Sequence, residues 1–127
     1  MDIAEKEEED MGDLIKCSEG FLILYAVDWR HSLEEAHRFR EEVLRIKEVN
    51  KFPMVLIGNK CDLELKRECT KEDGEALASC WAVPFFEVSA LSRANVKEAF
   101  IALLREIKKW GGLKGKSHKR GGGCILL

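Results

Sequence analysis

Residues 53–63 read Pro53-Met54-Val55-Leu56-Ile57-Gly58-Asn59-Lys60-Cys61-Asp62-Leu63, an apolar run that ends abruptly in Asn-Lys-x-Asp. A short, continuous apolar run is typical of a strand that is buried on both faces of a parallel sheet. The polar residues that follow then lie at the carboxyl end of that strand. Because ligands bind at this end of open α/β sheets, we expect a binding site here.

The polar residues of this stretch suit a guanine base. The carboxylate of Asp62 can accept two parallel hydrogen bonds, one from the ring N–H of guanine and one from its exocyclic amine, and adenine presents no such pair. The amide of Asn59 can donate to the purine N7, and the aliphatic stem of Lys60 can lie along the ring. The alternative is an ordinary polar loop after a strand.

A second polar pair, Ser89-Ala90, follows the next predicted strand. The backbone N–H of Ala90 can donate to the guanine O6, and the Ser89 hydroxyl can hold the loop or Asp62. The carboxyl ends of adjacent parallel strands meet at one edge of a sheet, so the two loops are predicted to form a single site.

The rest of the chain alternates between strand and helix signals. Apolar runs at 21–27, 53–59 and 84–88 predict strands, and a helix is predicted after each, opening at Ser32, at Thr70 and at Asn95 with an acidic residue three positions later. This order predicts parallel pairing through right-handed crossovers. The fold class is therefore α/β, a partial doubly wound parallel sheet of three strands with three helices. The apolar faces expected to be buried are Leu33, Ala36, Phe39, Val43 and Ile46, then Ala76, Leu77, Cys80 and Trp81, then Val96, Ala99, Phe100, Leu103 and Ile107.

The composition fits a single soluble domain. The chain has 127 residues, of which 46% are hydrophobic and 35% charged, with a net charge of -2. We divide it into an acidic mobile segment (1–12), a domain (13–110) and a basic flexible tail (111–127). No secretory signal or membrane-spanning segment is predicted. The five cysteines lack CxxC spacing and the histidines lack metal-ligand spacing with them, so reduced thiols and no metal site are expected.

From about Glu19 to Lys109 the sequence resembles the C-terminal portion of a Ras/Rap-type small GTPase. The motifs that carry the resemblance are Glu-Gly-Phe-Leu at 19–22, the run at 53–63, Phe-Glu-Val-Ser-Ala at 86–90 and the final Cys-a-a-Leu. The resemblance implies a P-loop GTPase-like sheet and binding of GTP or GDP. Where the family usually has Lys after Ser-Ala, this chain has Leu91, whose aliphatic body can still cover the base. The guanine-binding residues implied are Asn59, Lys60, Asp62, Ser89, Ala90 and Leu91.

The phosphate-binding and catalytic motifs of that family do not occur before Gly20. These are Gly-x-x-x-x-Gly-Lys-Ser/Thr, which also holds magnesium, and Asp-x-Ala-Gly-Gln. Residues 111–117 look like a phosphate loop, but they have the wrong spacing and follow a helix. No catalytic residue and no magnesium ligand is therefore predicted. Losing three or four phosphate contacts removes on the order of 6 kcal/mol, or about four decades in affinity, so weak nucleotide binding and negligible hydrolysis are expected.

The last four residues, Cys124 to Leu127, form a C-a-a-X signal, and a terminal Leu favours a geranylgeranyl group on Cys124. The alternative is a free cysteine in a frayed tail. One lipid chain anchors a protein only marginally, and basic residues upstream add about 1 kcal/mol each at an anionic membrane. We expect attachment to the cytoplasmic face of membranes, in particular the plasma membrane. The tail lacks interleaved aromatic residues, so nucleic acid is not expected. The basic residues are Lys108, Lys109, Lys114, Lys116, Lys119 and Arg120.

Two functions remain open. The first is a Ras-like GTP-binding protein anchored at a membrane and acting in signalling. The second is a non-enzymatic, prenylated interaction module with possible protein partners, a truncated or splice form of such a GTPase. A non-functional fragment is a third reading. With no strand before 21–27, the edge of that strand is expected to be unpaired, and marginal stability follows.

Overall fold

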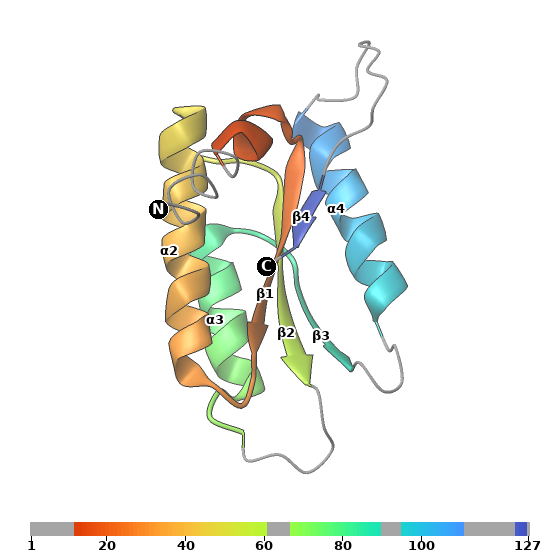
Figure 1. The fold of residues 1–127 in the computed structure, drawn as a ribbon. Helices are drawn as coiled ribbons and strands as arrows, with labels where there is room; N and C mark the ends of the chain where they lie inside the picture. The colour runs from red at the N-terminus through yellow and green to blue at the C-terminus, as the bar shows by residue number, and fades with distance from the viewer. Residues whose placement is uncertain (1–11, 61–66, 90–94, 111–123, 127) are drawn as a thin grey trace.

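The computed structural model describes residues 12–60, 67–89, 95–110 and 124–126. Three β–α units follow one another: β1 (Gly20–Ala26), α2 (Arg30–Lys47), β2 (Met54–Lys60), α3 (Lys71–Trp81), β3 (Phe85–Ser89) and α4 (Val96–Trp110). All strand pairs are parallel. Helices α2 and α3 cover one face of the sheet and α4 covers the other (Figure 1). The predicted α/β fold with a partial doubly wound sheet is confirmed.

Two elements of the described chain were not expected from the sequence. A short strand, β4 (Cys124–Leu126), gives the sheet the order β3-β2-β1-β4 and pairs with Gly20–Leu22 of β1. The prediction of an unpaired edge was therefore wrong for the first half of β1. An edge strand presents a row of backbone hydrogen-bond donors and acceptors. An extended apolar segment such as β4 can pair with them. The second unexpected element is a helical turn at 12–17, in which Ile15 is buried and only 1% exposed.

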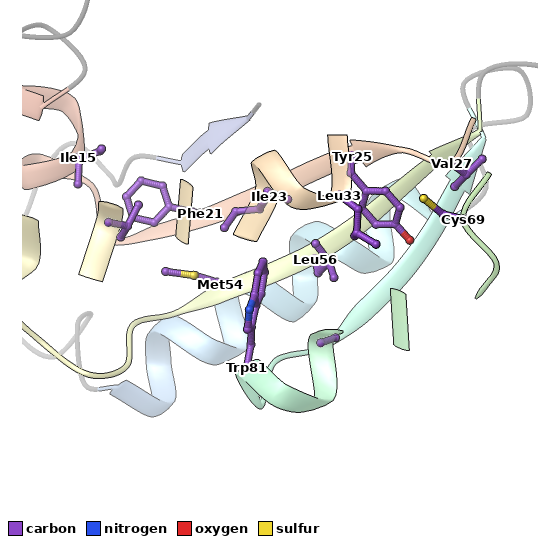
Figure 2. Close-up of a cluster of buried hydrophobic side chains, with 13 residues drawn as sticks. Ile15, Phe21, Ile23, Tyr25, Val27, Leu33, Met54, Leu56, Cys69 and Trp81 are labelled. Atoms are coloured by element: carbon purple, nitrogen blue, oxygen red, sulfur yellow. The ribbon is translucent and has the colours of Figure 1, made fainter. Parts of the chain in front are cut away.

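Both faces of the central strands are buried, which explains their continuous apolar sequences. Along β1, Phe21, Ile23 and Tyr25 join the cluster beneath α2 and α3 (Figure 2), and Leu22 joins the cluster beneath α4. In β2, alternate residues divide between the same two clusters. Side chains on a strand alternate between its two faces, so a strand between two helical layers needs apolar residues at every position.

The helix starts agree only in part with the predicted caps. Thr70 and Asp73 form the predicted capping box of α3, each side chain accepting from the other residue's backbone N–H. The capping box predicted at Ser32 was wrong, because the N-cap of α2 is Trp29, three residues earlier. The Ser32 hydroxyl instead accepts from the backbone N–H of Ala26 at 2.8 Å and so joins the helix to the end of β1.

The predicted helix faces were correct for α2 and partly wrong for α3 and α4. In α3 the buried residues are Gly74, Ala78 and Trp81, whereas Ala76 and Cys80 are exposed. Gly74 can face inward because it has no side chain, whereas a Cβ there would lie 2.4 Å from both the Tyr25 hydroxyl and the Phe85 ring. In α4, Ala99, Leu103 and Ile107 are buried, but Val96 and Phe100 are 39% and 41% exposed. The apolar face of α4 is wider than the surface of the sheet that the helix covers, so these two residues at its margin remain exposed.

Candidate functional site: the carboxyl edge of the sheet

The structure brings together those predicted base-binding residues that it describes. Asn59 and Lys60 are the last residues of β2, and Ser89 is the last residue of β3. In the register of the two strands Asn59 lies opposite Val88 and Lys60 lies opposite Ser89. The carboxyl ends of β2 and β3 therefore lie side by side at one edge of the sheet. Three further predicted residues, Asp62, Ala90 and Leu91, lie outside the described residues.

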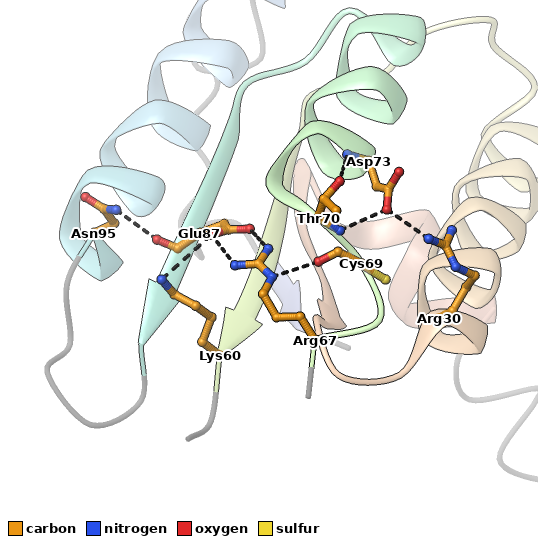
Figure 3. A network of polar contacts seen from close by, with 8 residues as sticks. All are labelled: Arg30, Lys60, Arg67, Cys69, Thr70, Asp73, Glu87 and Asn95. Carbon is orange, nitrogen blue, oxygen red and sulfur yellow. Dashed lines mark hydrogen bonds and ion pairs between the residues drawn. The ribbon is translucent and has the colours of Figure 1, made fainter. Parts of the chain in front are cut away.

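One carboxylate, that of Glu87, organises this edge (Figure 3). Glu87 lies two residues before the end of β3, and its side chain is only 10% exposed. Its oxygens accept hydrogen bonds from Arg67 at 3.3 and 2.5 Å, and the ammonium group of Lys60 lies 3.7 Å away. The backbone carbonyl of Glu87 also accepts a hydrogen bond from the side-chain amide of Asn95 at 2.8 Å. An acidic side chain in so enclosed a place is paired, as desolvation requires.

These contacts fix both ends of the segment that carries Asp62. Lys60 precedes that segment and Arg67 follows it, and both reach the same carboxylate. The Arg67 guanidinium also donates to the backbone carbonyl of Cys69 at 2.9 Å. Through its hydrogen bonds with Arg67, Glu87 raises the pKa of the guanidinium above its ordinary value. The two described residues that flank 61–66 are therefore held at the same carboxylate.

The backbone after this segment is attached to the end of β1. The N–H groups of Glu68 and Cys69 both donate to the carbonyl of Val27 at 2.9 Å. The N–H of Val27 in turn donates to the carbonyl of Asn59 at 3.2 Å. Strand β1 therefore supports the site without contributing a predicted base-binding residue.

A second polar cluster joins α2 to the start of α3. Arg30 donates to the carboxylate of Asp73 at 2.9 Å (Figure 3). It also donates to the backbone carbonyl of Glu68 at 3.0 Å. The backbone N–H of Thr70 and, next, the Arg30 guanidinium hold the pKa of Asp73 below its ordinary value. Because all these groups are partly exposed, their contacts add little to the stability of the fold. They mainly fix the position of residues 68–73 relative to α2.

Beneath the site lies a buried hydroxyl group. Tyr25 is 2% exposed, and its hydroxyl has no hydrogen-bond partner among the described residues. Burial, and next the charge of Glu87, raise the pKa of this hydroxyl above its ordinary value. The space it occupies exists because Gly58 and Gly74 have no side chains, since a Cβ on either would lie 2.8 or 2.4 Å from it.

Within the described ranges, no three His, Cys, Asp or Glu side chains gather closely enough to hold a metal ion. No helix in those ranges is both long and apolar enough to cross a membrane.

Glu87 and Arg67 are the residues that the sequence reasoning missed. Glu87 was visible as part of a motif but received no role, although an acidic residue between Phe86 and Val88 in a predicted buried strand is a signal for a buried ion pair. Nothing local indicates its partner. Arg67 lies twenty residues away and meets Glu87 only through the fold.

Comparison with known proteins identifies the family. The family model described as Ras family matches residues 8–109. The chain belongs to the Ras family. It is 43% identical over 123 residues to the Ras-like protein rasB of Dictyostelium discoideum, and 46% identical over 119 residues to the Ras-like protein rasC of the same organism. A Ras-like protein of Laccaria bicolor is 43% identical over 96 residues.

The coverage of these Ras relatives is partial. The alignments to rasB and rasC take in 89% of this chain and 62% of each relative. The alignment to the Laccaria protein takes in 76% of this chain and 46% of that relative. The chain therefore spans less than two thirds of the length of the Ras proteins it matches. The resemblance to a Ras-type small GTPase, drawn from four motifs, is confirmed.

Proposed function

We propose that this chain carries the base-recognition half of a Ras-like GTP-binding protein. The guanine of GTP or GDP is held by Asn59, Lys60 and Asp62 from one loop and by Ser89, Ala90 and Leu91 from the next. The observation that carries the proposal is the register of β2 and β3, which places Lys60 opposite Ser89. Family membership supports the nucleotide, and the pairing of Glu87 with both Lys60 and Arg67 supports the placement of Lys60 at the site.

Asp62 decides the specificity in this proposal. Its carboxylate accepts from the ring N–H and the exocyclic amine of guanine, so Asp62→Asn removes one acceptor and places a donor against a donor. Each hydrogen bond to a charged group contributes about 1.5 to 3 kcal/mol, so the variant should lose roughly ten- to a hundredfold in affinity.

The test is a titration of the purified chain against fluorescent GDP, with and without magnesium. Asp13→Asn is the matched control, because Asp13 is exposed on the helical turn before β1. We expect weak binding that Asp62→Asn reduces, that Asp13→Asn preserves and that magnesium does not change. Equal affinity in both variants would contradict base recognition. Tight, magnesium-dependent binding lost in Asp62→Asn would show phosphate ligands that the sequence analysis did not find.

We also propose that Cys124 is geranylgeranylated and that the lipid, with the basic tail, places the chain at the cytoplasmic face of the plasma membrane, where it acts in signalling. The C-a-a-X sequence and the six basic residues after Glu106 support this. Incubation with a prenyltransferase and geranylgeranyl diphosphate should add one lipid mass to the chain and none to Cys124→Ser. An unmodified wild-type chain would contradict the proposal.

The second candidate function is a prenylated interaction module that anchors at the membrane and contacts protein partners without hydrolysing GTP. The absence of the phosphate-binding motif from these 127 residues favours it. The Asp62→Asn arm of the titration separates the two candidates, because only the first requires GDP binding that depends on Asp62.

A further inference from the structure

A pocket lies at the opposite end of the sheet from the predicted base site. It encloses about 250 Å³ where β2 and β3 begin and α4 ends. Four parts of the chain build it: the middle of α2, the residues before β2, the end of α3 with the turn that follows, and the last turn of α4. The lining residues are Arg40, Lys51, Phe52, Pro53, Trp81, Ala82, Val83, Glu106, Lys109 and Trp110.

The charged side chains of this pocket are mostly cationic. Arg40 is the enclosed one, with a side chain only 14% exposed and its guanidinium 5.3 Å from the centre of the Trp81 ring. Its carboxylate neighbour is Glu41 at 3.4 Å. Lys109 lies 3.2 Å from Glu106, the single acidic residue of the lining. Lys51 is exposed and has no ion pair or hydrogen bond within the described residues.

The rest of the wall is aromatic, and part of it is exposed. The Phe52 and Trp110 rings meet edge to face with their centres 5.8 Å apart, and Trp110 remains 48% exposed. Tryptophan beside lysine and arginine is the combination that membrane–water interfaces favour, because the indole has an apolar body and a polar N–H. Trp110 is also the last residue of α4, directly before the basic tail.

We propose that this pocket binds the phosphomonoester of an anionic lipid headgroup and so fixes which face of the domain meets the membrane. The lining holds three cations and one acid, and even with Glu41 beside Arg40 a net positive charge remains to attract a phosphate group. An arginine held over an indole presents a planar pair of donors, which suits phosphate oxygens. The volume lies below the range of drug-sized ligand pockets and fits a single headgroup. The proposal takes its orientation from the proposed anchoring of the tail, but its test does not need the lipid on Cys124.

The experiment is co-sedimentation of the full, unlipidated chain with two kinds of vesicles of equal total charge. One contains phosphatidylinositol monophosphate, and the other contains phosphatidylserine, which has no phosphomonoester. We expect roughly tenfold tighter binding to the first, the value of one charge-assisted contact. Soluble inositol phosphate should compete for this excess binding only.

Variants separate the pocket from general attraction to negative charge. Arg40→Lys keeps the charge but loses the paired donors, and it should remove the preference for the phosphomonoester. Lys51→Gln with Lys109→Gln should do the same, whereas Lys71→Gln with Lys97→Gln, which removes equal charge from exposed positions at the starts of α3 and α4, should preserve it. Circular dichroism and thermal unfolding verify that each variant folds.

Equal binding to both vesicles, or equal losses in the two double variants, would overturn the proposal in favour of a non-specific basic surface. Binding of soluble inositol phosphate with no preference between vesicles would overturn the lipid source and leave a soluble phosphate ester as ligand. Either of these outcomes would refute the lipid proposal and leave the proposals of guanine binding through Asp62 and prenylation of Cys124 untouched.

Discussion

Replacing Glu87 by alanine tests whether one carboxylate holds the base site together. The change removes both hydrogen bonds from Arg67 and the nearby charge that faces Lys60. Breaking a fully buried ion pair costs about 3 to 5 kcal/mol, but Arg67 and Lys60 are 34% and 41% exposed and regain water. We therefore expect a loss of about 2 kcal/mol in the free energy of unfolding, measured by urea denaturation.

The same variant should weaken nucleotide binding beyond its effect on stability. With Glu87 gone, Lys60 and Arg67, the cations on either side of 61–66, lose their shared partner and repel each other, so the position of Lys60 at the base site is no longer fixed. We expect roughly a tenfold loss of affinity for fluorescent GDP under conditions where the chain is folded. Glu87→Gln keeps the shape and one acceptor, so it should lie between wild type and Glu87→Ala in both measurements.

Glu75→Gln serves as the control, because Glu75 is exposed on α3. Its unfolding free energy should remain within about 0.5 kcal/mol of wild type. If Glu87→Ala unfolds at the same urea concentration as this control, the ion pairs contribute no stability and the reasoning fails. If it is less stable but binds GDP as wild type does, Glu87 supports the fold and does not position the base loop.

Three further predictions concern the fold that carries the site. Gly74→Ala should lower the free energy of unfolding in urea by about 1 to 2 kcal/mol despite the better helix propensity of alanine, because the new Cβ would lie 2.4 Å from the Tyr25 hydroxyl and from Phe85. Adding Tyr25→Phe should recover part of this loss, and no recovery would contradict the contact with the hydroxyl. Thermal stability should fall as pH rises above about 9, because burial raises the pKa values of Cys69 and Tyr25 and the folded chain retains protons that the unfolded chain releases; a flat profile from about pH 8 to about pH 11 would refute this. Deleting 124–127 should lower the unfolding midpoint and increase self-association in analytical ultracentrifugation, because it removes β4 from the edge of the sheet, and an unchanged monomer would argue against that pairing.

Much of the architecture follows from local sequence signals. Apolar runs bounded by polar residues gave β1, β2 and β3 within one residue, because a strand between two helical layers is apolar at every position. Thr70 with Asp73 gave the start of α3, because a capping box is a contact between residues three apart. The parallel order of the units predicted that the carboxyl ends of β2 and β3 meet, and the register of the structure, with Lys60 opposite Ser89, agrees with this.

What the sequence did not predict depends on contacts between distant residues. Gly74 lies on the inward side of α3, because Tyr25 and Phe85, on two different strands, leave no room there for a side chain. Ser32 resembles a helix cap, yet it contacts the end of β1 because α2 begins earlier. Glu87 finds Arg67 only once α3 and β3 are in place. Local patterns identify elements, but they do not show which partners a charged or small residue meets.

The C-terminal residues form β4 in the structure, and the prenylation that we propose for Cys124 is incompatible with that strand. As β4 they cover Gly20–Leu22 of β1, and as a prenylation signal Cys124 must enter the active site of a transferase as part of a free, extended end. A strand of three residues contributes few ladder hydrogen bonds, so an enzyme can compete for it. Once Cys124 is modified and inserted in a membrane, the edge of β1 is open to another strand. The lipidated chain should therefore associate with a partner strand more readily than the unmodified chain does, and a lipidated chain that stays monomeric in nanodiscs, with the hydrogen-exchange protection of Gly20–Leu22 unchanged, would show that β1 keeps its cover.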